Sequence, residues 1–259
     1  MNVSEGVDRD LIAALGAAAG AELLDTHSDP HHHRTVFTMV GVDAPREVAR
    51  LAVERIDLRR HQGAHPRLGV VDVVPFVPLP GSSLDDALAA RNEFAGWMAD
   101  ELRVPCFLYG PQRALPEIRR RAWIDLAPDV VSAAANHPRA GATCVGARDV
   151  LIAYNVWLAP GVTVDQAKRV AAAVRGPAVR ALAISVGARL QLSMNLIRPE
   201  EVGPAEAFDA VAAWIPTDGC ELVGLLPAAT LDAIDPDRWA DLDLSSDRTI
   251  EARLAARPG

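Results

Sequence analysis

The chain has 259 residues, half of them apolar, so it is long enough to bury a core in one large domain or two smaller ones. Its formal net charge of −8, without a basic cluster, argues against nucleic acid or an anionic membrane surface as a partner. No apolar run of about 20 residues is present to span a bilayer. Residues 1–10 are too polar for a signal peptide, so we expect a soluble cytoplasmic protein.

Apolar periodicity and turn residues predict alternating helices and strands in the first half. A strand over 70–79 contains Pro75 and Pro78, which predicts an edge or bulged position. Ser83 is a predicted N-cap for the helix that follows. The predicted elements are helices over 7–19, 45–56 and 84–102, and strands over 21–25, 34–42, 70–79 and 104–109.

The pattern weakens over 112–140, which makes this segment the best candidate for a linker. We therefore predict two domains, residues 1–127 and residues 128–259. Thr163 is a predicted helix cap in the second domain. The predicted elements there are strands over 149–158, within 179–197 as a pair, and over 220–226, and helices over 163–174, 204–214 and after Pro227.

The two halves contain similar patterns. His-Pro-Arg-x-Gly occurs at 65–69 and again at 137–141, and residues 69–79 and 146–158 are both apolar strands followed by Pro-Gly and a capped helix. This order of strand, turn and helix predicts a tandem α/β duplication. Two such halves would create a cleft, a common place for a small-molecule site.

The segment 61–72 is the strongest candidate for a site. His61, His65 and Arg67 lie in a predicted loop with Gly63 and Gly69, which permit close backbone approach. Imidazole can take and return a proton near pH 7, and arginine offers a fixed fork for a carboxylate. A loop histidine that caps a helix end is the alternative interpretation.

A second histidine cluster covers residues 25–34. If this segment is extended, Asp25, His27, Asp29, His31 and His33 share one face, which suits metal ligands. Pro30 interrupts the pattern. A solvated histidine loop and a substrate-contacting loop are the alternatives.

Together these segments resemble the formiminotransferase family, whose enzymes move a formimino group between N-formimino-L-glutamate and tetrahydrofolate. The resemblance rests on segments spread over nearly the whole chain. They are Asn-Val-Ser-Glu-Gly at 2–6, Arg-Thr-Val-Phe-Thr at 34–38, His-x-Gly-x-His-Pro-Arg-x-Gly at 61–69 with Asp72, Ala-Gly-Ala-Thr at 140–143, Leu-Ile-Ala-Tyr-Asn at 151–155, Ser-Met-Asn at 193–195 and Glu-Leu-Val-Gly-Leu-Leu-Pro at 221–227.

The resemblance implies an α+β fold of two tandem ferredoxin-like subdomains, with folate in a cleft or tunnel between their sheets. It implies that His65 is the catalytic acid/base, which takes a proton from the attacking amine and returns one to the departing folate nitrogen. Arg67 would hold the amino-acid substrate, and Asp29 is the third expected catalytic residue. The expected folate- and substrate-binding residues are Ser4, Glu5, Arg34, His61, Gly63, His137, Pro138, Gly141, Ala142, Thr143, Asn155 and Asn195.

The sequence therefore predicts a one-carbon transferase that uses tetrahydrofolate as co-substrate, requires no metal and acts on small molecules. The resemblance leaves a homodimer open. Segments 128–133 and 196–203 depart from the family pattern. They motivate an alternative, a paralog that binds folate or another small anionic ligand without formimino transfer. A metal-dependent hydrolase built on residues 25–33 is a third hypothesis.

Overall fold

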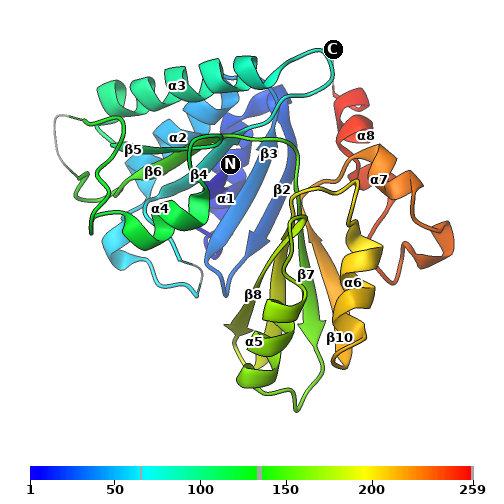
Figure 1. Cartoon of the computed structure of the whole chain (residues 1–259). Coiled ribbons are helices and arrows are strands. Elements are labelled where there is room, and N and C mark those ends of the chain that lie inside the picture. The colour runs from blue at the N-terminus through cyan, green and yellow to red at the C-terminus, as the bar shows by residue number, and fades with distance from the viewer. Residues whose placement is uncertain (65, 133–135, 258–259) are drawn as a thin grey trace. The chain divides into compact units, whose positions relative to one another are not determined.

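The computed structural model describes residues 1–64, 66–132 and 136–257. Its contacts divide the chain into two compact units, Met1–Asp149 and Val150–Gly259, which are described separately below. Both units combine one sheet with helices (Figure 1). The fold class is therefore the predicted α+β arrangement of two ferredoxin-like subdomains.

The first unit begins with a βαββαβ series, followed by a helical and strand extension. In the described part, its six-stranded sheet has the order β2-β3-β1-β4-β6-β5. β3 and β4 run antiparallel to β1, and β6 runs parallel to both β4 and β5. The elements are β1 (Asn2–Val3), α1 (Arg9–Ala18), β2 (Leu23–Asp29), β3 (Arg34–Met39), α2 (Ala44–Arg55), β4 (Val71–Phe76), α3 (Leu84–Glu101), β5 (Cys106–Tyr109), α4 (Leu115–Arg121) and β6 (Thr143–Ala147).

The local signals read from the sequence explain several of these elements. Ser83 caps α3 with a reciprocal capping box to Asp86, as predicted. Of the two predicted alternatives, the edge position is wrong, because β4 is an interior strand between β1 and β6, whereas the bulged strand is present as a register shift in the pairing of β4 with β1. Pro75 is tolerated there because the pairing with β1 ends at Val73, so no β1 residue stands opposite the proline.

The segment 112–140 is not a linker where it is described. It contains α4, whose Ile118 is fully buried, and Val130 forms a bridge with Cys106 of β5. The strand that follows, β6, is the partner of both β4 and β5. The contacts therefore place the division between the units at Asp149, whereas the sequence predicted a boundary after residue 127.

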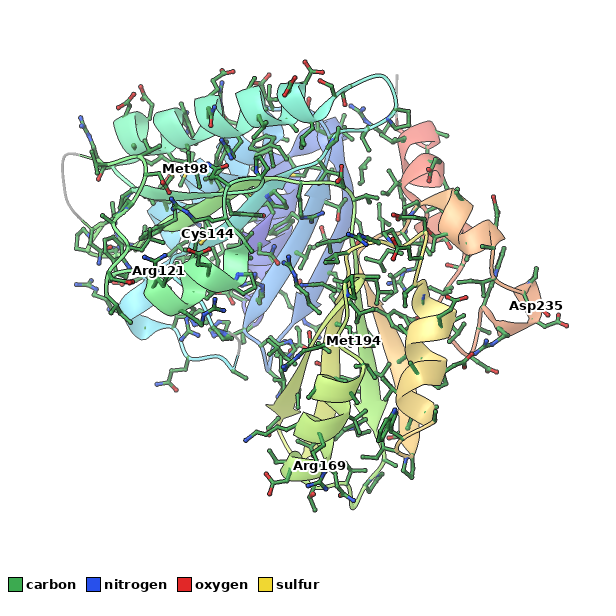
Figure 2. All side chains as sticks on the ribbon, viewed as in Figure 1. Met98, Arg121, Cys144, Arg169, Met194 and Asp235 are labelled. Atoms are coloured by element: carbon green, nitrogen blue, oxygen red, sulfur yellow. The ribbon has the colours of Figure 1, made fainter. Side chains whose placement is uncertain are left out.

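The second unit is a βαββαβ series with the same strand order as the start of the first. Its four-stranded sheet has the order β10-β7-β9-β8, which matches β4-β1-β3-β2. Figure 2 shows Met194 within this unit and Met98 and Cys144 within the first, whereas Arg169 and Asp235 are exposed. The elements are β7 (Ile152–Leu158), α5 (Val164–Ala173), β8 (Val179–Val186), β9 (Arg189–Leu196), α6 (Pro204–Ala212), β10 (Thr217–Val223), α7 (Ala228–Asp232) and α8 (Ile250–Ala255).

The predicted duplication is present in the topology, but the sequence pattern aligned the wrong elements. It matched β4 with β7, whereas β4 is the last strand of one βαββαβ series and β7 the first strand of the other. Both copies of His-Pro-Arg-x-Gly belong to the first unit. They precede β4 and β6, which are neighbouring parallel strands, and Gly69 and Gly141 form a bridge with each other.

Candidate functional site

Four connections of the first unit meet at one edge of its sheet. β3 and β4 run antiparallel to β1, so their N-terminal ends lie at the edge where β1 ends. β6 is parallel to β4 and begins at the same edge. The β1–α1 loop, the β2–β3 turn, the α2–β4 connection and the segment before β6 are thereby brought together.

Two glycines allow this close approach. A Cβ on Gly6 would come within 2.3 Å of the Asp29 carbonyl oxygen and 2.5 Å of the Arg34 nitrogen, both in the β2–β3 hairpin. A Cβ on Gly63 would come within 2.5 Å of the His32 carbonyl oxygen. Larger residues at either position would push these connections apart.

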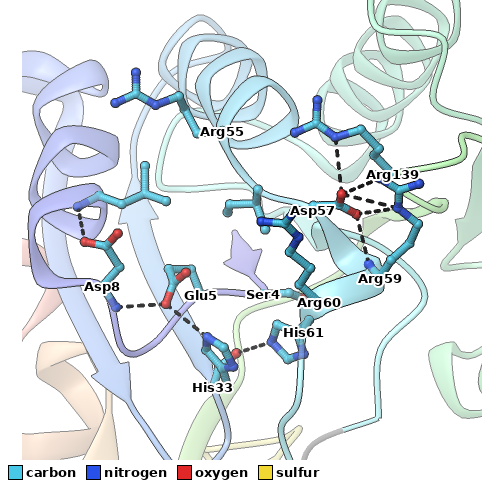
Figure 3. Close-up of a pocket in the computed structure, with 12 residues that line it drawn as sticks. Ser4, Glu5, Asp8, His33, Arg55, Asp57, Arg59, Arg60, His61 and Arg139 are labelled. Carbon is cyan, nitrogen blue, oxygen red and sulfur yellow. Dashed lines mark hydrogen bonds and ion pairs between the residues drawn. The ribbon is translucent and has the colours of Figure 1, made fainter.

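A pocket of about 480 Å³ lies where the connections meet (Figure 3). This volume is within the range that encloses small-molecule ligands. Histidine and carboxylate groups stand beside a series of arginines. The residues that line it are Ser4, Glu5, Asp8, Leu11, His33, Arg55, Ile56, Asp57, Arg59, Arg60, His61 and Arg139.

His33, His61 and Glu5 form a connected cluster in the pocket wall. The His33 and His61 rings are stacked, with centroids 4.1 Å apart. His33 Nε2 lies 3.1 Å from Glu5 Oε1, and its Nδ1 lies 2.8 Å from the Gln62 carbonyl oxygen. His61 Nε2 lies 2.8 Å from the His33 carbonyl oxygen, so Nε2 is the donor and carries the proton. His61 Nδ1 is therefore an acceptor, and it is buried without a partner among the described residues.

The environment controls the charge of two members of this cluster. Burial alone would raise the pKa of Glu5, but N–H groups of Asp8, Val7 and Gly6 and the nearby His33 lower it overall, so Glu5 is a carboxylate. Burial lowers the pKa of His61, which favours the neutral ring. A neutral imidazole beside a fixed carboxylate is suited to accepting a proton or a hydrogen bond.

The opposite wall of the pocket is basic. Asp57 accepts hydrogen bonds from Arg59, at 2.6 Å for the shortest, and lies 3.7 Å from Arg139. The hydrogen bonds from Arg59 hold the pKa of Asp57 well below its usual range. The guanidinium groups of Arg55 and Arg60 have no hydrogen bond or ion pair to any other described residue. They are consequently available to an anionic ligand.

The loop predicted to carry the chemistry joins this pocket on one side. His65 lies outside the described residues. Arg67 donates to the carbonyl oxygens of His61 and Gly63, both at 3.1 Å, so these contacts brace the loop. Ser4 likewise holds the end of the loop, because its hydroxyl donates to the Gly69 carbonyl oxygen at 2.8 Å.

A buried ion cluster anchors the same loop to the sheet. The carboxylate of Asp72 is fully buried and accepts from Arg34, Arg119 and the backbone N–H of Leu68. Burial alone would raise the pKa of Asp72, but these two arginines lower it far below its usual range. Arg34, predicted to bind substrate, therefore contacts Asp72 and, through Nε, Asn2.

The second His-Pro-Arg-x-Gly copy also lies beside the pocket. His137 Nδ1 accepts from the backbone N–H of Ala140 at 2.9 Å, which shapes the turn, and Pro138 in this turn is exposed. Gly141 has a φ of 71° and packs against Leu68, where a Cβ would meet the carbonyl oxygen at 2.3 Å. The next two predicted residues, Ala142 and Thr143, are buried, and the Thr143 hydroxyl donates to the Val71 carbonyl oxygen.

The histidine cluster at 25–34 does not form the predicted extended face. β2 ends at Asp29 and a turn follows, in which Asp29 Oδ1 accepts from the backbone N–H groups of His31 and His32 at 2.7 and 2.8 Å. Asp29 is thus placed as a turn residue and is outside the pocket lining. Among the described residues, no group of three or more His, Cys, Asp or Glu side chains could hold a metal ion.

The remaining predicted residues belong to the second unit. Asn155 of β7 donates to Glu221 Oε2 of β10 at 3.1 Å, and Asn195 of β9 is exposed. They share one face of the sheet, because Asn155 pairs with Ser193, two residues before Asn195. The structure describes them only within their own unit.

Sequence reasoning missed most of the basic wall. Arg55, Asp57, Arg59 and Arg60 follow one another closely at the end of α2, and Arg139 belongs to the second motif. The cluster of charges at 54–60 was a usable signal, but its position next to Glu5 depends on the sheet order.

None of the helices in the described part is long and apolar enough to cross a membrane. Comparisons with known proteins give a family match. The model of the formiminotransferase domain, N-terminal subdomain, matches residues 1–148, which agrees with the division after Asp149.

Curated relatives extend the similarity over most of the chain. A glutamate formimidoyltransferase of Streptococcus pyogenes serotype M1 is 33% identical over 266 residues, 89% of this chain and 88% of that protein. The enzyme of that name from Thermoplasma acidophilum is 31% identical over 273 residues, with the same coverage. The formimidoyltransferase-cyclodeaminase of Sus scrofa is 34% identical over 275 residues, 90% of this chain and 50% of that protein. The chain thus spans about half the length of such two-activity relatives.

Proposed function

The chain belongs to the formiminotransferase family, and on this premise we propose that it transfers a formimino group between N-formimino-L-glutamate and tetrahydrofolate. The similarity to proteins named glutamate formimidoyltransferase over nearly their whole length supports the reaction class. The observation that carries the proposal in the structure is the pocket itself, where imidazole and carboxylate groups face a basic wall.

Proton transfer is the central requirement of this reaction. The nitrogen that attacks the formimino carbon loses a proton, and the nitrogen that departs gains one. We assign this exchange to His65, because it follows His61 by four residues in the sequence, and His61, which lines the pocket, is braced by Arg67. A positioned imidazole contributes on the order of 10² to 10⁴ to such a step.

The basic wall supplies the binding energy for the amino-acid part. A formiminoglutamate molecule carries two carboxylates, and guanidinium groups pair with carboxylates through two parallel hydrogen bonds. Arg55 and Arg60 are available for this role, since neither is paired to a described side chain. In this proposal Arg67 acts on the loop and through it on His65.

The test is formimino transfer by His65→Ala with N-formimino-L-glutamate and tetrahydrofolate. We expect a loss of roughly 10²-fold or more in kcat. His27→Ala, which removes a histidine of β2 outside the pocket, is the matched control. Undiminished turnover by His65→Ala would remove this residue from the mechanism.

Arg55 and Arg60, whose guanidinium groups have no partner among the described residues, by themselves favour a second function. They suit binding of folate or another small anionic ligand even without transfer. Calorimetry separates the two functions: binding of folate by the wild type, with no transfer from the formimino donor, would support the binding protein and reject the transferase.

A further inference from the structure

The Glu5 carboxylate has one oxygen fully used and one unused. Oε1 accepts from the backbone N–H groups of Gly6, Val7 and Asp8 at 2.8 to 3.0 Å and lies 3.1 Å from His33 Nε2. Among the described residues, no hydrogen bond or ion pair reaches Oε2. The side chain is only 12% exposed and lines the pocket. It therefore presents an acceptor without a partner to whatever enters.

The neighbours of Glu5 keep this acceptor charged and fixed. The His33 ring is held on both sides, because its Nδ1 lies 2.8 Å from the Gln62 carbonyl oxygen and its Nε2 lies 3.1 Å from Oε1. The His33 ring and the three backbone N–H groups all contact Oε1, which fixes the orientation of the carboxylate. Oε2 is left in one orientation with only acceptor capacity.

The ligand of the proposed function has a group that matches this acceptor. The one-carbon unit of N-formimino-L-glutamate ends in an N–H group, whereas that of N-formyl-L-glutamate ends in a carbonyl oxygen. A carboxylate oxygen accepts from the first and is repelled by the second. Sites built around a hydrogen bond discriminate strongly in this way, because the wrong ligand leaves a desolvated polar group unpaired.

We propose that Glu5 is the specificity-determining residue of the pocket, and that its Oε2 accepts a hydrogen bond from the terminal nitrogen of the formimino group. Arg55 and Arg60 hold the carboxylate end of the same ligand. This inference rests on the proposed function, because it assigns a role to one residue in recognition of that reaction's donor. It goes beyond that function because it makes one side chain, Glu5, responsible for distinguishing a formimino group from a formyl group.

The test is calorimetric binding of N-formimino-L-glutamate and N-formyl-L-glutamate to the full chain, without tetrahydrofolate so that no turnover occurs. The wild type is expected to bind the formimino ligand at least about tenfold more tightly. In Glu5→Gln the preference disappears or inverts, since the amide can retain the backbone contacts through its oxygen and turns an N–H₂ donor toward the ligand. Arg60→Gln weakens both ligands by the same factor and leaves their ratio unchanged.

Two control variants separate local recognition from general charge effects. Glu117→Gln removes a carboxylate on α4 that pairs with Arg121, and Arg50→Gln removes a guanidinium of α2 outside the pocket. Both should retain the wild-type ratio. Equal binding of the two ligands by the wild type, binding too weak to measure for both, or a retained preference in Glu5→Gln would each overturn the proposal.

A crystal structure of the wild type with N-formimino-L-glutamate gives a second test if Glu5→Gln does not fold. The terminal nitrogen should lie within hydrogen-bond distance of Oε2, and any other position overturns the inference. A separate transfer assay distinguishes the two hypotheses. Discrimination without turnover would keep the role of Glu5 and reject the proposed function. Turnover without discrimination between the two ligands would keep the proposed function and reject the role of Glu5.

Discussion

In the first unit the β1–α1 loop brings Glu5 to the pocket, whereas the equivalent β7–α5 loop of the second unit, residues 159–163, has no ionisable side chain. The α2–β4 connection covers 56–70 and supplies the histidine motif, whereas its counterpart between α6 and β10 covers only 213–216. All seven histidines of the chain lie in the first unit. Two series with one strand order therefore differ almost entirely in their connections.

This difference shows that the strand order and the side chains of a site are determined by different parts of the chain. The shared βαββαβ order brings the same three connections to one edge of each sheet. In the first unit these connections carry ionisable side chains, and the α2–β4 connection is much longer than its counterpart in the second unit. The fold therefore determines where a site can form, and the length and composition of the loops determine whether one does.

The largest expected effect concerns the buried ion cluster, which the second unit lacks among its described residues. Asp72→Ala leaves Arg34 and Arg119 facing each other without their shared carboxylate, so we expect the free energy of unfolding to fall by about 3–5 kcal/mol. Glu221→Ala in the second unit removes a partly buried carboxylate bonded to Asn155, and should cost about 1–2 kcal/mol. Urea unfolding measures both, and hydrogen exchange assigns each loss to its unit. Equal losses would contradict the comparison.

An intermediate effect concerns pH and the histidines. Because burial lowers the pKa of His61 in the folded state, the unfolded chain binds more protons once the pH falls below about 6.5. Stability contributed by the neutral His61 is therefore present above that pH and is lost as the pH falls. His61→Gln keeps a donor for the His33 carbonyl oxygen but cannot titrate.

Urea unfolding at pH 7.5, 6.5 and 5.5 tests this expectation. The advantage of the wild type over His61→Gln should shrink as the pH decreases, by about 1 kcal/mol or less. Hydrogen exchange in the second unit, which has no histidine, should not differ between the two proteins. An advantage that grows at lower pH would show that the ring is stabilised in its charged form.

The smallest effect is expected in the connection that corresponds to the site loop. Trp214 of the second unit is 68% exposed, in the short segment between α6 and β10. Trp214→Ser should change the free energy of unfolding by no more than about 0.5 kcal/mol and leave formimino transfer unchanged. A marked loss of transfer in an otherwise stable protein would mean that this connection also contributes to the site.

Local signals in the sequence predicted individual elements well. The predicted N-caps Ser83 and Thr163 are both present, because a cap depends on residues within three positions, and the structure adds a reciprocal capping box to each. For β4 the prolines predicted an edge or bulged strand; the pairing with β1 has a register shift, but the edge position is wrong, because the tolerance of Pro75 depends on how far β1 extends beside it. The prediction of a linker over 112–140 was wrong. The segment is polar, but its Arg119 pairs with Asp72, a residue distant in the sequence, and this contact could not be predicted from local composition.

In the candidate site, too, local features could be predicted from the sequence and long-range contacts could not. Asp72 and the loop 61–69 were recognisable as a motif, but the basic wall was not, since Arg55 and Arg139 are brought together only by the sheet order. The repeated His-Pro-Arg-x-Gly motif was real, yet it marks two neighbouring parallel strands rather than two equivalent units. A short repeat records local backbone geometry and carries no information on which sheet a strand joins.

The sequence by itself determined most of the longer helices and strands, the caps at Ser83 and Thr163, and the resemblance to a family through motifs spread along the chain, but not β1, α4, β6 or α8. Those features depend on residues within a few positions of one another. Only the tertiary structure decided that Glu5, His33, His61 and Arg139 line one pocket, and that one oxygen of Glu5 has no partner among the described residues. Such facts arise from antiparallel strand pairing, which places the ends of distant segments at one edge, and no local pattern encodes that pairing.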